Sequence, residues 1–554
     1  MTFTPWAPSF VGGLRLKNYG AAGDGVTDDS VAVQTWLNAV AAQTPNGGNG
    51  YADPGTYLIG TTPSLNGANR IRLAGAGQAT IFRAKNATQP NLLQFTNCTR
   101  IQIASMAFDG NRAGVNQIAT QYLTLAGIWM QNCDDITLSR LRIDNAYSSG
   151  VMLNGGCTNV AMSRLRLTNC GDNQIYVRAQ NLTPFTPCSN VTITNCIATG
   201  GSFSGIQGLG STYLTVTGCV CNSNGPTSAQ GDGIGSEGCS YFTFVGNVCA
   251  SNGIQGIQSR FTSEVGTNQQ SSHGLIAGNL CYNHTSSNGD AGGIGVNDTD
   301  DITVGPNHCY ANYYGLNVNG GFGLGVSHLK VEGGTYRSNL NAGIRLAPGS
   351  GSDYKIDGPY VADNGADNLT CSAPVQIRGG SYLRAPASRE GIHLATGANN
   401  SLIVGAEISN NHDNGVLIDS PVTGTQIREC LFNGSGSDQL RAVQEQAGAG
   451  PTAIQNCVIL NQQNNLYVLN NASSIGPGPL TAPGVPATTV ALANPFPGLA
   501  TVYITAGAST CAVAIGATTM LTLAAAGTGT VQLPIGQAIK LTYASAPTWT
   551  WAGS

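Results

Sequence analysis

Short apolar segments that open with glycine recur along the middle of the chain. An aliphatic residue follows most of these glycines, and inward and outward positions then alternate as in a β-strand. Most neighbouring segments begin twenty to thirty residues apart, and a 48-residue step between Gly343 and Gly391 leaves room for one more turn at 368–371. This period, with no helical pattern between the strands, predicts a parallel β-solenoid. The segments begin at Gly127, Gly150, Gly205, Gly233, Gly256, Gly293, Gly315, Gly343, Gly391 and Gly415.

A second set of strands follows the same period. When seven of these segments are aligned on their first residue, the eighth position is always apolar or cysteine: Ile143, Leu167, Ala198, Cys221, Cys249, Cys281 and Cys309. We expect this column to face inward, with each turn about 4.8 Å from the next. A disulfide needs Cβ atoms closer together than that stacking provides, so the column favours a ladder of buried free thiols over two bridges.

The stretch GAAGDGVTDDS at residues 20–30 contains Asp24, Asp28 and Asp29, which raises the question of a metal or catalytic site. It lacks the spacing of a calcium-binding EF-hand loop. The residues that follow carry an apolar face at helical spacing, formed by Val33, Trp36, Leu37 and Val40. We therefore expect a short helix that caps the first turn of the solenoid, with Asp28, Asp29 or Ser30 at its N-cap.

The amino-acid composition of the chain changes near residue 471. Residues 471–490 are rich in proline and glycine and predict a linker, and residues 491–554 alternate like the strands of a small β-sandwich. Lys540 is the only charged side chain after residue 470. We expect four parts: an N-terminal cap with the first turns (1–95), the parallel β-helix with a glycan-binding face (96–470), the linker (471–490) and a C-terminal module (491–554). So few charges predict that this module meets another surface.

Composition excludes several classes of function. Charged residues make up 9% of the chain and the net charge is −4, so we expect no nucleic-acid partner. The 16 cysteines show no zinc-type pairing. The N-terminal residues have no signal-peptide pattern, and no apolar stretch is long enough to span a membrane, so we expect no membrane insertion.

Two motifs carry a resemblance to a known family. The segments LKNYGAAGDGVTDDSVAVQTWL and YADPGTYLIG resemble the N-terminal signature of the pectate-lyase-like right-handed β-helix superfamily, which includes pectin-degrading enzymes and bacteriophage tailspike depolymerases. The segment LPIGQAIKLTYASAPTWTW resembles C-terminal modules of phage tail proteins, which in that family assemble trimers or bind carbohydrate. The resemblance implies an all-β fold and a homotrimeric tailspike of the virion tail, made in the host cytoplasm and released by lysis.

Positions two and four after each glycine are expected to point outward and to form a strip across the turns. This strip begins with aromatic residues and continues with amide, arginine and glutamate side chains, a composition that suits an extended polysaccharide. The strip therefore predicts a polysaccharide as the partner, and the resemblance to tailspikes implies a bacterial surface polysaccharide. The candidate substrate-binding residues are Trp129, Tyr176, Arg178, Gln207, Gln258, Arg260, Asn297 and Asn317.

Glu237 is the only carboxylate at the centre of the strip. Glycoside hydrolysis needs two carboxylates that flank the bond, so the candidate catalytic residues are Glu237 with Asp232 or Asp290. Asp172 precedes a neighbouring strand at the same edge. Glu264 begins an insertion expected to wall the binding face.

Three alternatives stay open. In the first, a uronic-acid polymer is cleaved by β-elimination, with roles for Tyr176, Arg178, Arg260, His273 or His284, in a tailspike or in a secreted cellular lyase. In the second, a tail fibre binds the glycan without cutting it. In the third, calcium takes part, as it does in some β-helix lyases. We otherwise predict no cofactor and no metal, because no acidic cluster evident in the sequence requires one. The motif set of the pectin hydrolases is missing from the sequence, which disfavours a polygalacturonase.

Overall fold

The computed structural model describes residues 13–553 except 44–46, 115–124, 181–184, 226–230, 265–268, 287–290, 322, 348, 435–438, 463–466, 470–473, 476–477, 481–482, 496–499 and 535. Internal contacts divide the chain into two compact units. The first contains residues 1–330 with 348–351, and the second contains residues 331–347 with 352–554. β33 (Ser327–Glu332) contains the boundary between them.

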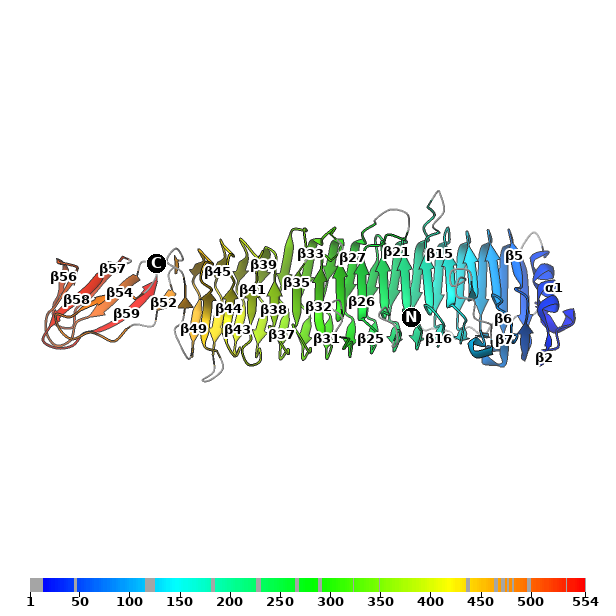
Figure 1. Ribbon diagram of the computed structural model, residues 1–554, viewed down its shortest axis with the longest axis horizontal. Helices are drawn as coiled ribbons and strands as arrows, with labels where there is room; N and C mark the ends of the chain where they lie inside the picture. Colours follow the sequence, from blue (N-terminus) through cyan, green and yellow to red (C-terminus); the bar gives the residue numbers. More distant parts are fainter. Residues whose placement is uncertain are drawn as a thin grey trace, which may run out of the picture. The chain divides into compact units, whose positions relative to one another are not determined.

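The first unit is a parallel β-solenoid in which the turns contribute strands to three sheets (Figure 1). Sheet A contains β1 (Leu14–Arg15), β3 (Gly48–Ala52), β6 (Asn69–Gly75), β9 (Thr99–Ala104), β12 (Asp134–Ser139), β15 (Thr158–Ser163), β18 (Ser189–Thr194), β21 (Thr212–Thr217), β24 (Thr243–Val245), β27 (Ser272–Ala277) and β30 (Asp300–Val304). Sheet B contains β2 (Asp24–Asp28), β4 (Gly55–Ile59), β7 (Thr80–Ala84), β10 (Ala107–Asp109), β13 (Arg142–Asp144), β16 (Arg166–Thr168), β19 (Ile197–Thr199), β22 (Val220–Asn222), β25 (Val248–Ala250), β28 (Leu280–Tyr282) and β31 (His308–Tyr310).

Sheet C carries the glycine-initiated strands. In the first unit it contains β5 (Ser64–Asn66), β8 (Leu93–Thr96), β11 (Ala126–Gln131), β14 (Ser149–Asn154), β17 (Ile175–Arg178), β20 (Ile206–Leu209), β23 (Ile234–Glu237), β26 (Gln255–Arg260), β29 (Gly292–Asn297) and β32 (Tyr314–Asn319). The leading glycines have a steric cause. A Cβ on Gly233 would lie 2.5 Å from the carbonyl oxygen of Gly256 on the next turn, and one on Gly256 would lie 2.5 Å from that of Gly293. Only glycine lets the turns stack this closely.

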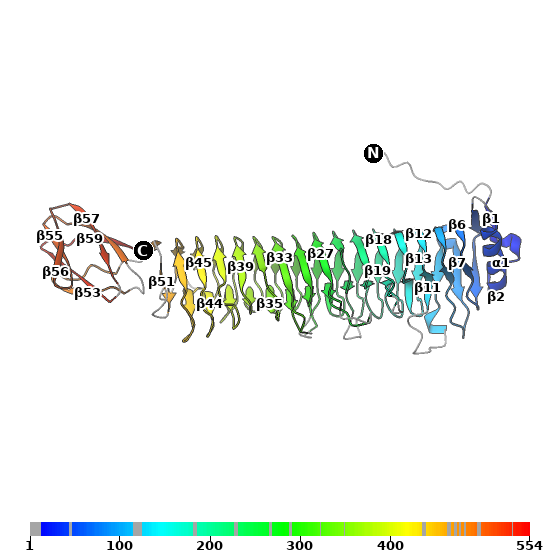
Figure 2. The same cartoon turned by 90° about the horizontal axis from the view of Figure 1, so that it is seen from above.

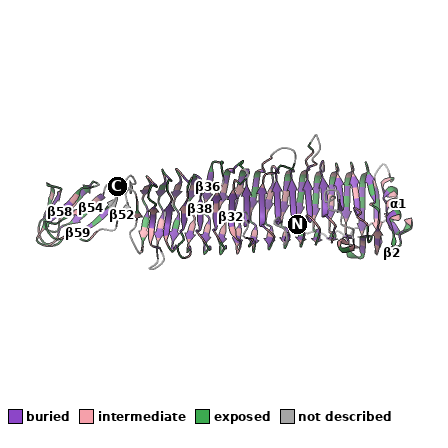
Figure 3. Ribbon diagram, in the orientation of Figure 1, coloured by how far each residue is buried: buried purple, intermediate pink, exposed green. Residues whose placement is uncertain are grey.

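The cysteine ladder is confirmed. Ile143, Leu167, Ala198, Cys221, Cys249, Cys281 and Cys309 pair in register along sheet B, and all of them are fully buried. All 16 cysteines are buried free thiols. Buried residues run along the strands from turn to turn (Figure 3). The core of the first unit is therefore made of stacked apolar and thiol columns rather than cross-links.

Buried amide ladders complete this core. Asn279 donates to the carbonyl oxygen of Phe244 at 2.9 Å and to Oδ1 of Asn307 at 3.0 Å, and its own Oδ1 accepts the amide N–H of Asn247 at 2.9 Å. A second ladder runs through Asn224, Asn252, His284 and Asn312. Each side chain serves the turn that precedes it and the turn that follows, which fixes the register of the stack.

Helix α1 (Ser30–Ala41) closes the first turn, as the apolar spacing predicts (Figure 2). Val33, Trp36, Leu37 and Val40 are fully buried, and the Trp36 indole donates to the carbonyl oxygen of Leu14 at 2.8 Å. Short 3-10 helices lie at η1 (Leu16–Tyr19), η2 (Gly77–Ala79) and η3 (Arg112–Gly114). In the part of the chain that is described, no helix is both long and apolar enough to cross a bilayer.

The N-cap of α1 is Asp29, one of the three residues expected there, although the aspartates before the helix bond to other nearby backbone amides. Asp29 occupies the N-cap position but makes no side-chain cap bond. Its carboxylate instead accepts the amide N–H groups of Ala22 at 2.7 Å and Gly23 at 3.1 Å. Asp24 similarly accepts the amides of Val26 and Thr27. The stretch is therefore a turn held by its own carboxylates.

The second unit continues the same architecture. Sheet C contains β35 (Ile344–Ala347), β38 (Leu369–Cys371), β41 (Ile392–Leu394), β44 (Asn414–Ile418), β47 (Arg441–Glu445) and β50 (Tyr467–Val468). β38 is the turn that the 48-residue step left room for. Sheet A contains β36 (Tyr354–Asp357), β39 (Val375–Arg378), β42 (Leu402–Val404), β45 (Gln426–Arg428), β48 (Ala453–Gln455) and β51 (Ser474–Ile475). Sheet B contains β34 (Thr335–Arg337), β37 (Tyr360–Ala362), β40 (Ser381–Leu383), β43 (Glu407–Ser409), β46 (Leu431–Asn433) and β49 (Val458–Leu460).

The C-terminal strands form two antiparallel sheets with a common core. One sheet contains β52 (Gly478–Leu480), β59 (Thr548–Gly553), β54 (Ala500–Thr505) and β57 (Thr528–Leu533). The other contains β53 (Ala491–Ala493), β58 (Ala538–Tyr543), β55 (Cys511–Ile515) and β56 (Thr518–Leu523). Val502 and Trp551 from the first sheet pack in one cluster with Val513 and Leu541 from the second. The small β-sandwich expected at 491–554 is therefore present, but it also includes β52, which lies within the residues 471–490 predicted as a linker.

Candidate functional site

The outward positions of sheet C in the first unit form two columns in strict register. We call these columns the strip. The first column contains Trp129, Met152, Tyr176, Gln207, Gly235, Gln258, Gly295 and Asn317. The second contains Asn154, Arg178, Leu209, Glu237, Arg260, Asn297 and Asn319.

The aromatic end of the strip differs from the expectation of an open sugar-binding platform. Trp129 and Tyr176 are each only 7% exposed, and they pack in one apolar cluster with Met152 and Leu209. Large side chains on consecutive turns lie within van der Waals reach of each other, so they bury one another before any ligand arrives. Burial also raises the pKa of the Tyr176 phenol far above its ordinary value.

Polar atoms along the strip are buried without hydrogen-bond partners among the described residues. They belong to six side chains that follow the two columns from one end to the other. A buried polar atom without a partner costs free energy, and native proteins leave few of them unless water or a ligand completes the contact. The atoms are Nε1 of Trp129, Oδ1 of Asn154, Nε of Arg178, Oε1 of Gln207, Oε1 of Gln258 and Oδ1 of Asn297.

Glu237 lies at the centre of the strip and is 7% exposed. Its Oε1 forms an ion pair with Nη2 of Arg260 on the next turn and accepts Nε2 of Gln207 from the previous turn at 3.0 Å. Burial raises the pKa of Glu237 above its ordinary value, although the Arg260 guanidinium opposes the shift. Both contacts engage the same oxygen, so one carboxylate atom anchors the side chain in the column.

Two further acidic residues, Asp232 and Glu264, act on Arg260 in the same region. Asp232 is buried two residues before β23, where its backbone N–H donates to Oγ of Ser204 at 3.2 Å. Burial lowers the pKa of Arg260, but the carboxylates of Glu237 and Asp232 outweigh it and raise that pKa overall. Glu264 is exposed and adds to this effect. Asp290 lies outside the described residues.

Asp172 occupies the neighbouring edge. Its Oδ2 accepts the hydroxyl of Ser149 at 3.2 Å, and burial raises its pKa.

The two histidine candidates lie elsewhere. His284 is fully buried inside the solenoid, with Nδ1 2.8 Å from Oδ1 of Asn312 and Nε2 3.1 Å from Nδ2 of Asn252. Its proposed role in catalysis is wrong, because its side chain belongs to the core ladder and faces no substrate. His273 is exposed and stacks on Tyr241, with ring centroids 4.6 Å apart.

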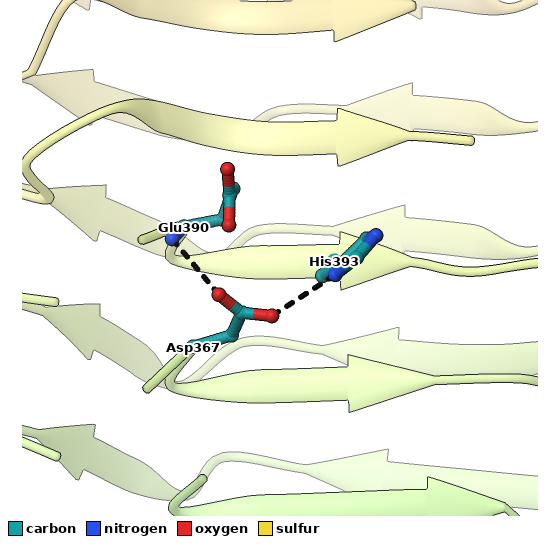
Figure 4. A group of neighbouring side chains, drawn as sticks. All are labelled: Asp367, Glu390 and His393. Atoms are coloured by element: carbon teal, nitrogen blue, oxygen red, sulfur yellow. Dashed lines mark hydrogen bonds and ion pairs between the residues drawn. The ribbon is translucent and has the colours of Figure 1, made fainter. Parts of the chain in front are cut away.

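The second unit contains a cluster that the sequence analysis did not identify (Figure 4). Ligand atoms of Asp367, Glu390 and His393 all lie within 4.8 Å of one another. Burial would raise the pKa of Asp367, but hydrogen bonds with His393 and Glu390 lower it to about 2. Burial and the adjacent Asp367 raise the pKa of Glu390 to about 8. Burial opposes protonation of His393, but the carboxylates of Asp367 and Asp419 raise its pKa to about 9.

Two hollows on sheet B offer a further location. They have volumes of about 470 and 440 Å³ and share Asp109 and Asn145 in their linings. Asp109 and Asp144 pair in register on consecutive turns, and each forms an ion pair with an arginine, Arg83 and Arg142 respectively. This site has room for a ligand, whereas the strip has the polar atoms that lack partners.

The comparisons with known proteins agree with the stacked turns. A family model described as "Right handed beta helix region" matches residues 126–271. The solved structure of the pre-mature gene product 12 of bacteriophage phi29 aligns with a TM-score of 0.55 at 13% identity, over 97% of this chain and 90% of that one. The chain is therefore a right-handed parallel β-helix protein.

Curated relatives match parts of the chain. A pre-neck appendage protein of Bacillus phage B103 is 23% identical over 217 residues, which cover 38% of this chain and 23% of that protein. The mannuronan C5-epimerase AlgE6 of Azotobacter vinelandii is 31% identical over 111 residues, which cover 18% of this chain and 12% of the epimerase. The chain thus spans about a quarter or less of the length of these relatives.

Proposed function

We propose that this protein is a bacteriophage appendage that binds a bacterial surface polysaccharide along the strip and cleaves it there by hydrolysis. The observation that carries the proposal is the row of six buried polar atoms without partners. A glycan presents hydroxyl and carbonyl groups at regular intervals, so it would supply donors to the amide oxygens and acceptors to the indole and guanidinium N–H groups.

The polarity of the strip suits a partly anionic or heavily hydroxylated glycan. Arg178 and Arg260 lie in one column and are separated by Leu209 and Glu237. Planar guanidinium groups bind carboxylates and vicinal hydroxyls with two parallel hydrogen bonds. Because the strip is buried and little water competes, each such hydrogen bond contributes more to the binding free energy.

Glu237 is proposed as the general acid. Burial shifts its pKa upward, which is the direction a general acid needs, and it would donate a proton to the glycosidic oxygen as the bond from C1 breaks. Asp232 is proposed as the base that takes a proton from the water attacking C1. Exchange with solvent then restores both groups.

The spacing of these residues favours inversion at the anomeric carbon. Glu237 and Asp232 are five residues apart on one turn, so extended chain places their Cα atoms up to about 17 Å apart. The adjacent residues in the Glu237 column are Leu209 and Arg260, neither of which is a carboxylate. A partner at the retaining separation of about 5.5 Å is thus missing from the column, so we propose inversion, for which the two carboxyl groups stand about 6.5–9.5 Å apart.

Elimination is the second candidate, and one observation favours it. The epimerase relative is named for a polymer of mannuronic acid, a uronic acid, so the strip arginines would meet a carboxylate on such a substrate. The chain's own residues support hydrolysis better. His284 is confined to the core. Because burial raises the pKa of Tyr176, little of its phenolate is present to act as a base.

The phage assignment rests on the names of the relatives and on the composition of the C-terminal sandwich. Pre-neck appendage proteins of Bacillus phages match up to 38% of the chain. Lys540 is the only charged residue after 470, which leaves the sandwich a surface suited to association. We infer a virion tail or neck component that forms homotrimers through this module.

The test is digestion of a panel of purified bacterial capsules, exopolysaccharides and O-antigens. Reducing ends, ultraviolet absorbance of unsaturated sugars and the anomer first formed, read by NMR, are measured together. We expect reducing ends without absorbance, and an inverted anomer. Absorbance that rises with the reducing ends would mean elimination, and binding without either would mean a glycan-binding fibre.

Variants locate the reaction. Glu237→Gln and Asp232→Asn should bind glycan and lose at least about 100-fold in rate, since a general acid or base contributes about 10²–10⁴-fold. Asp135→Asn is the matched control, because this carboxylate is exposed near the start of β12 and has a left-handed backbone conformation that asparagine also adopts. If Asp144→Asn abolishes cleavage while Glu237→Gln retains it, the reaction occurs in the sheet B hollows and our site is wrong.

A further inference from the structure

The cluster in the second unit combines three carboxylates with one imidazole on the outer side of sheet C. Asp367 and Glu390 each lie two residues before a strand, β38 and β41, and His393 lies within β41. Asp419 follows β44 and approaches the far side of His393. Two consecutive turns of the solenoid therefore bring the three ligating atoms together, and a third turn supplies Asp419.

The cluster contains three carboxyl groups and one imidazole, so the imidazole alone cannot neutralise three ionised carboxylates. Glu390 is 6% exposed, and no lysine or arginine forms an ion pair with it in the described part of the chain. The nearest charged groups that act on it are Asp367, His393 and Asp413, two of which are acidic. A buried carboxylate beside another carboxylate is costly unless a proton or a cation is held between them.

The histidine is oriented in the way that metal-ligating histidines are. Its Nε2 lies 3.1 Å from Oδ2 of Asp419, and its Nδ1 lies 2.9 Å from Oδ2 of Asp367. A carboxylate on the far nitrogen fixes the ring and makes the near nitrogen a better ligand. Asp367 is fixed as well, because its Oδ1 accepts the backbone N–H of Glu390 at 3.2 Å. The contact with Asp419 and the hydrogen bond from the Glu390 backbone N–H therefore hold His393 and Asp367 in place, independently of the three ligand atoms that face each other.

We propose that Asp367, Glu390 and His393 bind one divalent transition-metal ion of the zinc and manganese class. Two carboxylate oxygens and one imidazole nitrogen match the ligand types of these ions, whereas calcium and magnesium take oxygen ligands. Three protein ligands leave a coordination position for water or a sugar oxygen. Asp419 acts through His393 and is a positioning residue.

The test uses the full chain, stripped with a chelator and dialysed. Isothermal titration with ZnCl₂, MnCl₂ and CaCl₂, and metal analysis after gel filtration, measure stoichiometry and affinity. We expect one zinc or manganese ion per chain, no saturable calcium binding, and a rise in the thermal midpoint with the bound metal. Wild-type protein that binds neither zinc nor manganese would overturn the proposal and leave the cluster as an ion-pair ladder.

Variants assign the ligands. Glu390→Gln and Asp367→Asn are close in shape to the native residues and should abolish stoichiometric binding, whereas Asp419→Asn should weaken it by about 10–100-fold. Asp363→Asn is the control, because Asp363 forms an exposed ion pair with Arg384 in the same unit. Circular dichroism of each metal-free variant checks the fold. Equal binding by Glu390→Gln, Asp367→Asn and wild type would show that metal binds elsewhere and refute the assignment.

Discussion

Replacement of His284 by asparagine tests whether this histidine is a ladder residue or a catalytic one. The ladder contains Asn224, Asn252, His284 and Asn312, so an asparagine at position 284 would match the other three residues. Oδ1 of Asn312 only accepts, which places a proton on Nδ1 of His284 and leaves Nε2 to accept from Nδ2 of Asn252. Protonation of Nε2 would set two donors against each other in a dry core.

The consequence is a loss of stability in acid that the variant should lack. Burial lowers the pKa of His284, although Cys281 and the Asn312 hydrogen bond oppose the shift. Since the folded-state pKa is depressed, the contribution of neutral His284 is complete above the unfolded pKa of about 6.5 and is lost as pH falls below it. Proton uptake by the unfolded-state imidazole alone costs at most about 2 kcal/mol between pH 7 and pH 5, and the depressed folded-state pKa sets the sign of the effect.

The assay is thermal or urea unfolding of wild type and His284→Asn at both pH values. Other titrating groups are shared by the two proteins and cancel in the difference. We expect comparable stability at pH 7 and an advantage for the variant of about 1–2 kcal/mol at pH 5. Glycan cleavage should persist in the variant. Equal acid sensitivity of the two proteins, or lost cleavage by a folded variant, would refute this account of His284.

Three further outcomes follow from the fold. Trp36→Ala should lower the free energy of unfolding by about 3–5 kcal/mol, because it empties a fully buried site and removes the hydrogen bond to Leu14. The control Val31→Ala, on the exposed face of α1, should change stability by less than about 0.5 kcal/mol. Equal midpoints of the two variants in thermal unfolding would contradict the capping role. A thiol reagent should label almost none of the 16 cysteines in the native protein and all of them in denaturant, and a deficit after denaturation would mean disulfides. Sedimentation should give a trimer that a chain ending at residue 470 does not form, and a monomeric full chain would exclude the proposed assembly.

The register of the strip could be predicted from sequence because one column constrains the others. Once Ile206, Ile234 and Ile257 are stacked, residues at equal offsets from them must also stack, since parallel pairing shifts whole strands together. The ladder at Cys221, Cys249 and Cys281 followed from the same argument. Periodicity therefore identified which residues are neighbours across turns that are separated by more than twenty positions.

Burial of the strip could not be predicted in this way. Alternation assigns a side chain to the outer face but says nothing of what lies over it. Trp129 and Tyr176 point outward as expected, yet they are buried against each other and against Met152. Similarly, His284 follows a strand and lies in a corner, where the alternation that governs strands no longer applies.

The sequence contains a positional pattern that indicates the acidic cluster, although the repeat of glycine-initiated strands does not reveal it. Asp232, Asp367 and Glu390 all lie two residues before the first inward aliphatic residue of a sheet C strand, so they share one position of the turn. In the first unit the neighbours of Asp232 at this position are Ser204 and Gln255, which are neutral.

The same position therefore does different chemistry in the two units. An isolated carboxylate such as Asp232 acts on a cation one turn away, as its effect on Arg260 shows. Carboxylates on consecutive turns, such as Asp367 and Glu390, are brought within about 5 Å by the stacking alone, so they must share a proton or bind a cation. We therefore propose that charge at one offset on successive turns of a solenoid favours cation binding, whereas a single carboxylate at that offset, such as Asp232, is the candidate for catalysis.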